Sequence, residues 1–118
     1  MAKRVAIVVN GKENPNLYPA FILGTSAQVY DAEVTLFFTP TAAPALVPGF
    51  LEGIQAKGLP DMAKLVSDFR ELGGKIQLCV LALEAKGMKE SDLREGVEIV
   101  DAPTFMETAL DCTCTFSF

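Results

Sequence analysis

The run "RVAIVV", residues 4–9, decides the fold class of this chain. It is rich in β-branched residues and shows no alternation of apolar and polar side chains. Such a pattern is typical of a strand that is covered on both faces, as strands in parallel sheets are. The run ends at the turn-rich segment "NGKENPN", residues 10–16, so we expect the chain to leave the sheet there.

Downstream of this strand, helical patterns alternate with strand patterns. Apolar residues at helical spacing predict helices over residues 17–32, 60–74 and 103–111. Short apolar runs predict further strands over residues 33–38, 75–83 (running into a helical start), 97–101 and 113–118. In the first helix, Pro19 is tolerable only in the first turn. The alternation indicates βαβ crossovers, and therefore an α/β fold with a mainly parallel sheet and helices on both faces.

Residues 40–59 interrupt this alternation with three prolines and a group of apolar side chains. The apolar group comprises Leu46, Val47, Phe50, Leu51 and Ile54. A long irregular segment in a compact domain is usually functional or mobile. Two interpretations stay open: a short helix over "GFLEGIQAKG", residues 49–58, that merely covers the sheet, or a lid or subunit contact.

Length and charge narrow the class of protein. The chain has 118 residues, half of them apolar, and a net charge of −5 at pH 7. This length suits one domain over residues 1–118, with a core large enough to need no disulfide or metal. The acidic balance supplies no basic surface for phosphates, so we expect no nucleic acid partner.

Nothing in the sequence indicates export or membrane insertion. The apolar run after the basic start is too short for the core of a signal peptide. No stretch approaches the length of about 18 apolar residues that a membrane span needs. The odd number of cysteines, three, fits a reducing compartment in which thiols stay free. We therefore expect a cytoplasmic protein without an integral membrane segment.

The chain contains no histidine. This excludes Ser-His and Cys-His catalysis, histidine metal ligands and the histidine pH switch. The roles of acid, base and nucleophile are left to cysteine, lysine, tyrosine and carboxylates. We expect neither a metal nor another cofactor.

Polar loops follow the first two strands at their carboxyl ends. Asn10, Gly11 and Lys12 follow the first strand, but a single glycine there matches neither a Walker loop nor a dinucleotide fingerprint. Thr39 and Pro40 follow the second strand. Because ligands in open α/β sheets bind at the carboxyl ends of strands, we expect these five residues to line a pocket.

The terminal sequence "DCTCTFSF", residues 111–118, holds two cysteines one residue apart. Its cysteines and phenylalanines fall on one strand parity, and its threonines and serine fall on the other. This predicts a half-buried strand in which Cys112 and Cys114 are small core residues. A structural zinc site needs four ligands, and the sequence offers neither histidine nor a second close pair of cysteines.

The remaining cysteine, Cys79, stands late in a predicted buried strand, just before a helical start. In parallel sheets this edge is where sites form, and a helix N-terminus lends positive potential that favours thiolate. Lys86, within the next two turns, would line the same pocket and add a cation. A lone cysteine in a strand is also commonly a core residue, so the pattern leaves both roles open.

The residues around Cys79 also carry a family resemblance. A strand ends in Cys79, and "GM" at 87–88, "DL" at 92–93, "GVEI" at 96–99 and Phe105 follow in order. The segments "KRVAIVV", "YPAFILGTSA" and "AEVTLFFT" supply the upstream half. Together, in order and spacing, they resemble the DsrE/DsrF-like family of sulfur-relay proteins, in its branch of small single-chain, peroxiredoxin-like or sulfurtransferase proteins.

The resemblance implies a three-layer α/β/α fold, DsrEFH-like with flavodoxin-like topology, around a five-stranded, mainly parallel sheet. It implies homo-oligomers, trimers or hexamers, and sulfur-donor and acceptor proteins as partners. It also implies that Cys79 carries sulfane sulfur as a persulfide, in a sulfur carrier or sulfurtransferase subunit. The branch often has Met and Ser beside this cysteine, whereas this chain has "LAL" at 81–83, which suggests a drier pocket.

Three alternatives stay open. The chain could be a non-catalytic oligomeric or binding module in which Cys79 is buried and inert. It could hold a small molecule or nucleotide at the same strand ends. In the terminal segment, Cys112 could reach Cys79 as a resolving thiol.

Overall fold

The computed structural model describes residues 3–118 and contains a five-stranded sheet in which all pairings are parallel. The strands are β1 (Arg4–Val9), β2 (Glu33–Phe38), β3 (Lys75–Cys79), β4 (Val97–Val100) and β5 (Cys114–Ser117). Their order across the sheet is β4-β3-β2-β1-β5. The predicted α/β class with a five-stranded parallel sheet is confirmed.

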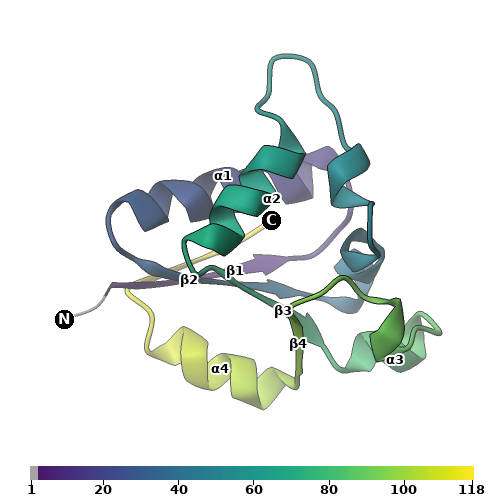
Figure 1. The fold of residues 1–118 in the computed structure, drawn as a ribbon. Coiled ribbons are helices and arrows are strands. Elements are labelled where there is room, and N and C mark those ends of the chain that lie inside the picture. The colour runs from purple at the N-terminus through teal and green to yellow at the C-terminus, as the bar shows by residue number, and fades with distance from the viewer. Residues whose placement is uncertain (1–2) are drawn as a thin grey trace.

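Helices lie on both faces of this sheet (Figure 1). They are α1 (Asn14–Val29), α2 (Met62–Glu71), α3 (Leu81–Ala85) and α4 (Ala102–Leu110), with 3-10 turns at Pro40–Leu46, Leu51–Gly53 and Glu90–Asp92. Helices α1 and α2 cover one face and α4 lies on the other (Figure 1). We call these the α1/α2 face and the α4 face.

The strand order explains why α4 stands apart. From β1 to β4 the chain moves in one direction across the sheet, and right-handed crossovers then keep the connecting helices on one face. From β4 it returns over β3, β2 and β1 to reach β5. A right-handed crossover in the opposite direction must use the opposite face, so α4 lies on the other side of the sheet from α1 and α2.

In this order β1 lies between β2 and β5. The flavodoxin-like order that the sequence suggested places β1 between β2 and β3. The three-layer architecture agrees with the prediction, whereas the strand order departs from it at this point. The reason is the long return crossover through α4, which brings the last strand beside the first.

The α1/α2 face carries the main core. Side chains of alternate strand positions meet the two helices there and are almost fully buried, among them Ile7, Leu36, Phe38, Ile76 and Leu78. Phe21 of α1 meets Phe69 of α2 edge to face, with ring centroids 5.6 Å apart. Burial of this apolar surface is the largest stabilising contribution in the fold.

The α4 face carries a second, smaller cluster. It consists of Ala6, Phe37, Cys79 and Phe105, and the Phe37 and Phe105 rings stack with centroids 4.2 Å apart. Helix α4 begins at its N-cap Asp101, whose carboxylate accepts a hydrogen bond of 2.9 Å from the Thr104 amide. Hydrogen bonding from the Thr104 side chain, and to a lesser extent from its amide, lowers the pKa of Asp101, and the amide bond fixes where the helix starts.

Several predicted boundaries need correction. Helix α1 begins at Asn14 rather than at residue 17, so Pro19 lies inside the helix and not in its first turn. The predicted strand over residues 75–83 ends at Cys79, where α3 follows almost at once. Residues 40–59 form two 3-10 helices in place of one short helix. Leu46 and Leu51 are fully buried in the main core, which supports the covering role.

The terminal strand differs most from its prediction. β5 lies at the edge of the sheet, and all four of its residues, Cys114 to Ser117, are exposed. Cys112 precedes the strand, and its side chain packs against the cluster on the α4 face. Cys114 pairs with Val5, which belongs to the other core, so the two cysteines point to opposite faces. The predicted inward stripe is therefore wrong for Cys112, which packs on the other face, and for Cys114 and Phe116, which are exposed because β5 is an edge strand. Phe118 agrees with the prediction, since it is partly buried against the main core.

Candidate functional site

Cys79 is the last residue of β3, at the carboxyl edge of the sheet, and is 5% exposed. It lies in register with Val100, the last residue of β4. The Val80 amide donates a hydrogen bond of 2.8 Å to the Val100 carbonyl oxygen, which holds these two strand ends together.

After the carboxyl ends of β3 and β4, the chain continues on different faces of the sheet. After β3, Ala82 joins the core of the α1/α2 face, whereas after β4 the chain enters α4 on the other face. In open α/β sheets, the place where successive connections diverge is where ligands bind. Cys79 therefore stands at the topological switch point of this fold.

The surroundings of Cys79 are apolar. Its neighbours in the cluster are Ala6, Phe37 and Phe105, with Val100 partly buried beside them. Helix α3, which begins two residues later, has only five residues, so few peptide dipoles add up at its N-terminus. The thiol lies in a dry, aromatic environment, with less helix potential than the sequence suggested.

The structure brings two of the predicted pocket residues together at this edge. Thr39 Oγ1 donates a hydrogen bond of 2.7 Å to Asn10 Oδ1. The Asn10 amide donates to the Phe118 carbonyl at 2.8 Å, and the Thr39 amide donates to the Val9 carbonyl at 3.0 Å. These bonds join the ends of β1, β2 and β5. Asn10 and Thr39 thus form a polar rim beside the strand ends.

The other predicted pocket residues have different environments. Gly11 is buried, and a Cβ there would meet the Asn16 amide group, so a larger residue would require that side chain to shift. Pro40 opens the first 3-10 helix. Lys12 and Lys86 are exposed, and within residues 3–118 neither forms an ion pair. Lys86 caps the end of α3 rather than its start, away from the β3 junction.

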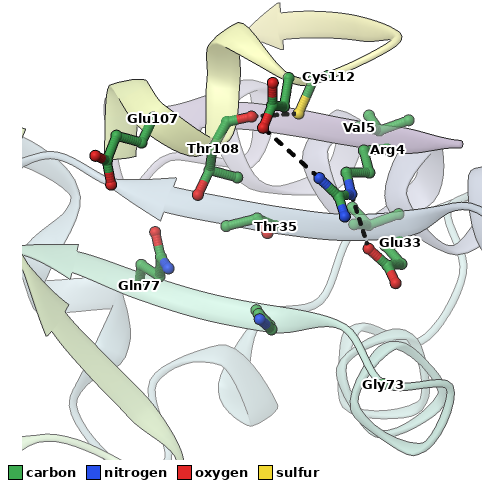
Figure 2. A pocket seen from close by; sticks show the side chains of 12 residues that line it. Arg4, Val5, Glu33, Thr35, Gly73, Gln77, Glu107, Thr108 and Cys112 are labelled. Atoms are coloured by element: carbon green, nitrogen blue, oxygen red, sulfur yellow. Dashed lines mark hydrogen bonds and ion pairs between the residues drawn. The ribbon is translucent and has the colours of Figure 1, made fainter. Parts of the chain in front are cut away.

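Sequence reasoning missed a polar strip on the α4 face. Thr35 of β2 and Gln77 of β3 are each 7% exposed and point to this face. They line a cavity of about 440 Å³ near the amino ends of the strands, under the last turns of α4 (Figure 2). A polar residue in each of two apolar runs, "EVTLFF" and "KIQLC", was the available signal.

Cys112 borders this cavity and is remote from Cys79 along the sheet. It follows α4 at the amino ends of the strands, where the Thr113 amide donates to the Arg4 carbonyl, whereas Cys79 lies at the carboxyl ends. Its Sγ donates to the Thr108 carbonyl at 3.2 Å (Figure 2). Burial raises the pKa of the Cys112 thiol, against an opposing effect of Arg4. The described fold does not pair Cys112 with Cys79.

The fold and the site together define a class: a three-layer α/β/α protein with an all-parallel sheet and a cysteine at the switch point of that sheet. The reactive group that this site offers is the cysteine thiol. The family model of the DsrE/DsrF-like family matches residues 3–118. The chain belongs to the DsrE/DsrF-like family, as the segments around Cys79 indicated.

The uncharacterised protein MJ0760 of Methanocaldococcus jannaschii is 32% identical over 89 residues. The match covers 75% of this chain and 32% of that relative, so the chain spans about a third of its length.

Two solved structures share the fold. The YchN protein of E. coli has a TM-score of 0.77 at 20% identity, with all of both chains covered. Protein MTH1491 of Methanobacterium thermoautotrophicum, of unknown function, has a TM-score of 0.69 at 16% identity, with 97% of this chain and 98% of that chain covered.

Within the described residues, no helix has both the length and the apolar character that a membrane crossing requires.

Proposed function

We propose that this chain is a cytoplasmic sulfur carrier or sulfurtransferase subunit that holds sulfane sulfur as a persulfide on Cys79. The observation that carries the proposal is the position of Cys79, as the last residue of β3 at the switch point of the sheet. Membership of the DsrE/DsrF-like family supports a role related to sulfur relay. Sulfur-donor and acceptor proteins are the partners that this role requires.

The proposed chemistry needs only a thiolate and access to it. The Cys79 thiolate attacks the outer sulfur of a donor persulfide, R–S–SH. The new S–S bond forms as the donor S–S bond breaks, so Cys79 becomes Cys–S–SH and the donor leaves as R–S⁻. An acceptor thiolate then repeats the exchange in the other direction. Thiol exchange of this kind requires no general base, which suits a chain without histidine.

Access is the step that the fold must provide. Cys79 is 5% exposed and shares its cluster with the stacked rings of Phe37 and Phe105. Phe105 belongs to α4, the one helix on that face among the described residues that packs on this cluster. Movement of α4 away from the sheet would open the thiol to a donor, or to a small thiol reagent, without disturbing the main core.

The test compares three forms of the full chain after treatment with a persulfide donor: wild type, Cys79→Ser, and the Cys112→Ser/Cys114→Ser double variant. Intact-mass measurement should find one added sulfur in the wild type and the double variant, and none in Cys79→Ser. The double variant is the matched control, because it keeps only the cysteine of interest. An added sulfur on the Cys79→Ser variant would refute the proposal.

The burial of Cys79 favours one second candidate, a non-catalytic binding module in which this thiol is inert. Iodoacetamide labelling of the folded chain separates the two. In the sulfur carrier, Cys79 is modified under native conditions, whereas in the inert module it reacts only after unfolding. Exposed Cys114 serves as the internal reference for reagent activity.

We further propose that the chain forms homo-oligomers, trimers or hexamers. Exposed apolar side chains support this, since Met106, Leu110 and Phe116 border a groove between α4 and the edge strand β5. Light scattering at micromolar concentration should give a mass well above 12.7 kDa. A monomer under these conditions would contradict the proposal.

A further inference from the structure

The cavity near the amino ends of the strands is a second candidate site. It lies between α4 and strands β1 to β3, at the edge of the sheet opposite Cys79, and has a volume of about 440 Å³ (Figure 2). This volume is in the range of pockets that hold small molecules. Its walls are mainly polar, with Arg4, Thr35, Lys75, Gln77, Glu107 and Thr108 among them.

Gln77 is the feature that points to a ligand. Its side chain comes from the middle of β3, is 93% buried, and extends from the strand toward α4 (Figure 2). Gln77 Oε1 has no hydrogen-bond partner among residues 3–118. Folded proteins rarely leave a buried amide oxygen unpaired, because it has lost water and gained nothing in return. A bound group with an N–H or O–H donor would satisfy it.

Two charged side chains that line the cavity form no ion pair among residues 3–118. Arg4 is held by Glu33 at 3.2 Å and by Asp111 at 3.8 Å, so its charge is already balanced (Figure 2). Lys75 of β3 and Glu107 of α4 also line the cavity, and within residues 3–118 neither forms an ion pair. One wall therefore offers a cation and the facing wall offers an anion.

We propose that this cavity binds a small zwitterion of the amino-acid class. Its ammonium group donates hydrogen bonds to Gln77 Oε1 and to the Glu107 carboxylate, and its carboxylate pairs with the Lys75 ammonium. The ligand thereby supplies the donor that Gln77 lacks and balances both free charges. This site goes beyond the sulfur relay, since it uses no atom of Cys79.

Cys112 forms part of the wall and is not a reacting group here. Its S–H donates to the Thr108 carbonyl oxygen of the preceding helical turn. The neutral thiol that this bond requires is a poor nucleophile. The proposed interaction is therefore reversible and non-covalent.

The first experiment measures binding to the full chain by isothermal titration calorimetry and by two-dimensional NMR of the Gln side-chain amides. The probes are glycine, L-serine and L-glutamine, with ethylamine and propionate as analogues that carry only one of the two charges. The amino acids should bind and shift the Gln77 side-chain amide signals. Each single-charge analogue should bind about tenfold more weakly, because it loses one charge-assisted contact.

The second experiment tests whether Glu107 and Lys75 bind the amino acid. Glu107→Gln and Lys75→Gln alter exposed side chains, so the fold should be preserved, and each should weaken amino-acid binding about tenfold. Glu71→Gln and Lys86→Gln make the same changes outside the cavity and should leave binding unchanged. Cys79→Ser should also bind normally, which keeps this test separate from the persulfide test.

Three results would overturn the inference. The first is the absence of any heat or amide shift with all three amino acids at millimolar concentration. The second is ethylamine or propionate binding as tightly as the amino acids. The third is binding that survives both Glu107→Gln and Lys75→Gln.

Discussion

The two faces of the sheet differ in the polarity of their side chains and in how many helices cover them. On the α1/α2 face, the inward side chains of β1, β2 and β3 are apolar and two helices seal them from water. On the α4 face, β2 presents Thr35 and β3 presents Gln77 and Cys79, and the helix that covers them among the described residues is the nine-residue α4. The first face supplies stability, and the second holds a buried thiol at one end and polar groups beside a cavity at the other. The difference follows from the handedness of the crossovers, which sends only the return connection to the second face.

The largest expected effect is on the α1/α2 face. Phe69 is fully buried and meets Phe21 edge to face. Phe69→Ala should lower the free energy of unfolding by about 3–5 kcal/mol, because it leaves a cavity between two helices that cannot close in. Urea denaturation measures the loss. If Phe69→Ala lost less unfolding free energy than a phenylalanine-to-alanine change on the α4 face, the α1/α2 face would not be the main source of stability.

That equivalent change is Phe105→Ala. Phe105 packs on a smaller cluster beside an existing cavity, where the chain can relax, so we expect a loss of about 2–3 kcal/mol. The same variant should speed the iodoacetamide labelling of Cys79, since one of the two stacked rings in its cluster is gone. Peptide mass analysis after timed labelling measures the rate. Unchanged labelling would mean that Phe105 does not control access to the thiol.

A third prediction concerns the unpaired amide. In the absence of ligand, Gln77→Met should raise the free energy of unfolding by about 1 kcal/mol, because it replaces an unsatisfied buried oxygen with an apolar chain of similar size. The adjacent change Leu78→Gln places an amide on the α1/α2 face and should destabilise by several times that amount. Thermal melts of the two variants provide the comparison. Destabilisation by Gln77→Met would show that the oxygen is already satisfied.

Cys112 gives a pH-dependent test of the α4 face. Burial raises the pKa of this thiol, so the folded protein favours its neutral form. Stability from this effect is present below the ordinary thiol pKa and is lost as the pH rises through the raised value. Iodoacetamide should therefore modify Cys112 more slowly in the folded chain than in urea at mildly alkaline pH. Equal rates would indicate that α4 opens freely at its end.

The smallest effect is expected at the rim of the α1/α2 face. Arg94 binds Glu52 through both guanidinium nitrogens, at 3.2 and 2.5 Å, and this lowers the pKa of Glu52. The pair stabilises the fold above the ordinary carboxyl pKa of 4.5, and this stability is lost as the pH falls through the lowered value. At neutral pH, Glu52→Gln should cost only about 0.5 kcal/mol, because solvent screens the partly exposed pair.

The difference between wild type and Glu52→Gln should shrink at acidic pH and at high salt. Melting temperatures over a pH and salt series measure it. A difference that persists in acid would assign the effect to packing of the side chain and not to its charge.

Much of the fold could be predicted from local patterns. Apolar runs and, at the tail, strand parity predicted five strands, and all five are present, although the third ends at Cys79 and not at residue 83. The place of Cys79 at the end of a strand also followed from its run, "KIQLC". The tail could not be predicted in this way, because strand parity reports which residues share a face but not whether anything covers that face.

The cavity under α4 was also beyond local reasoning. Arg4, Gln77 and Glu107 are far apart in the sequence. Pairing with β2 brings β1 and β3 together, and the return crossover places α4 over them. Gln77 was visible as a polar residue in an apolar run, but its unpaired oxygen is a property of the packed structure.

The sequence by itself determined the α/β class, the family and the strand end that holds Cys79, because these depend on side-chain patterns within short segments. Only the tertiary structure decided on which face of the sheet the chain continues after each strand. It also decided how deeply Cys79 is buried and placed "DCTCTFSF" at an exposed edge of the sheet. These depend on contacts between distant segments. The handedness of one crossover fixed them by placing α4 on the opposite face from α1 and α2.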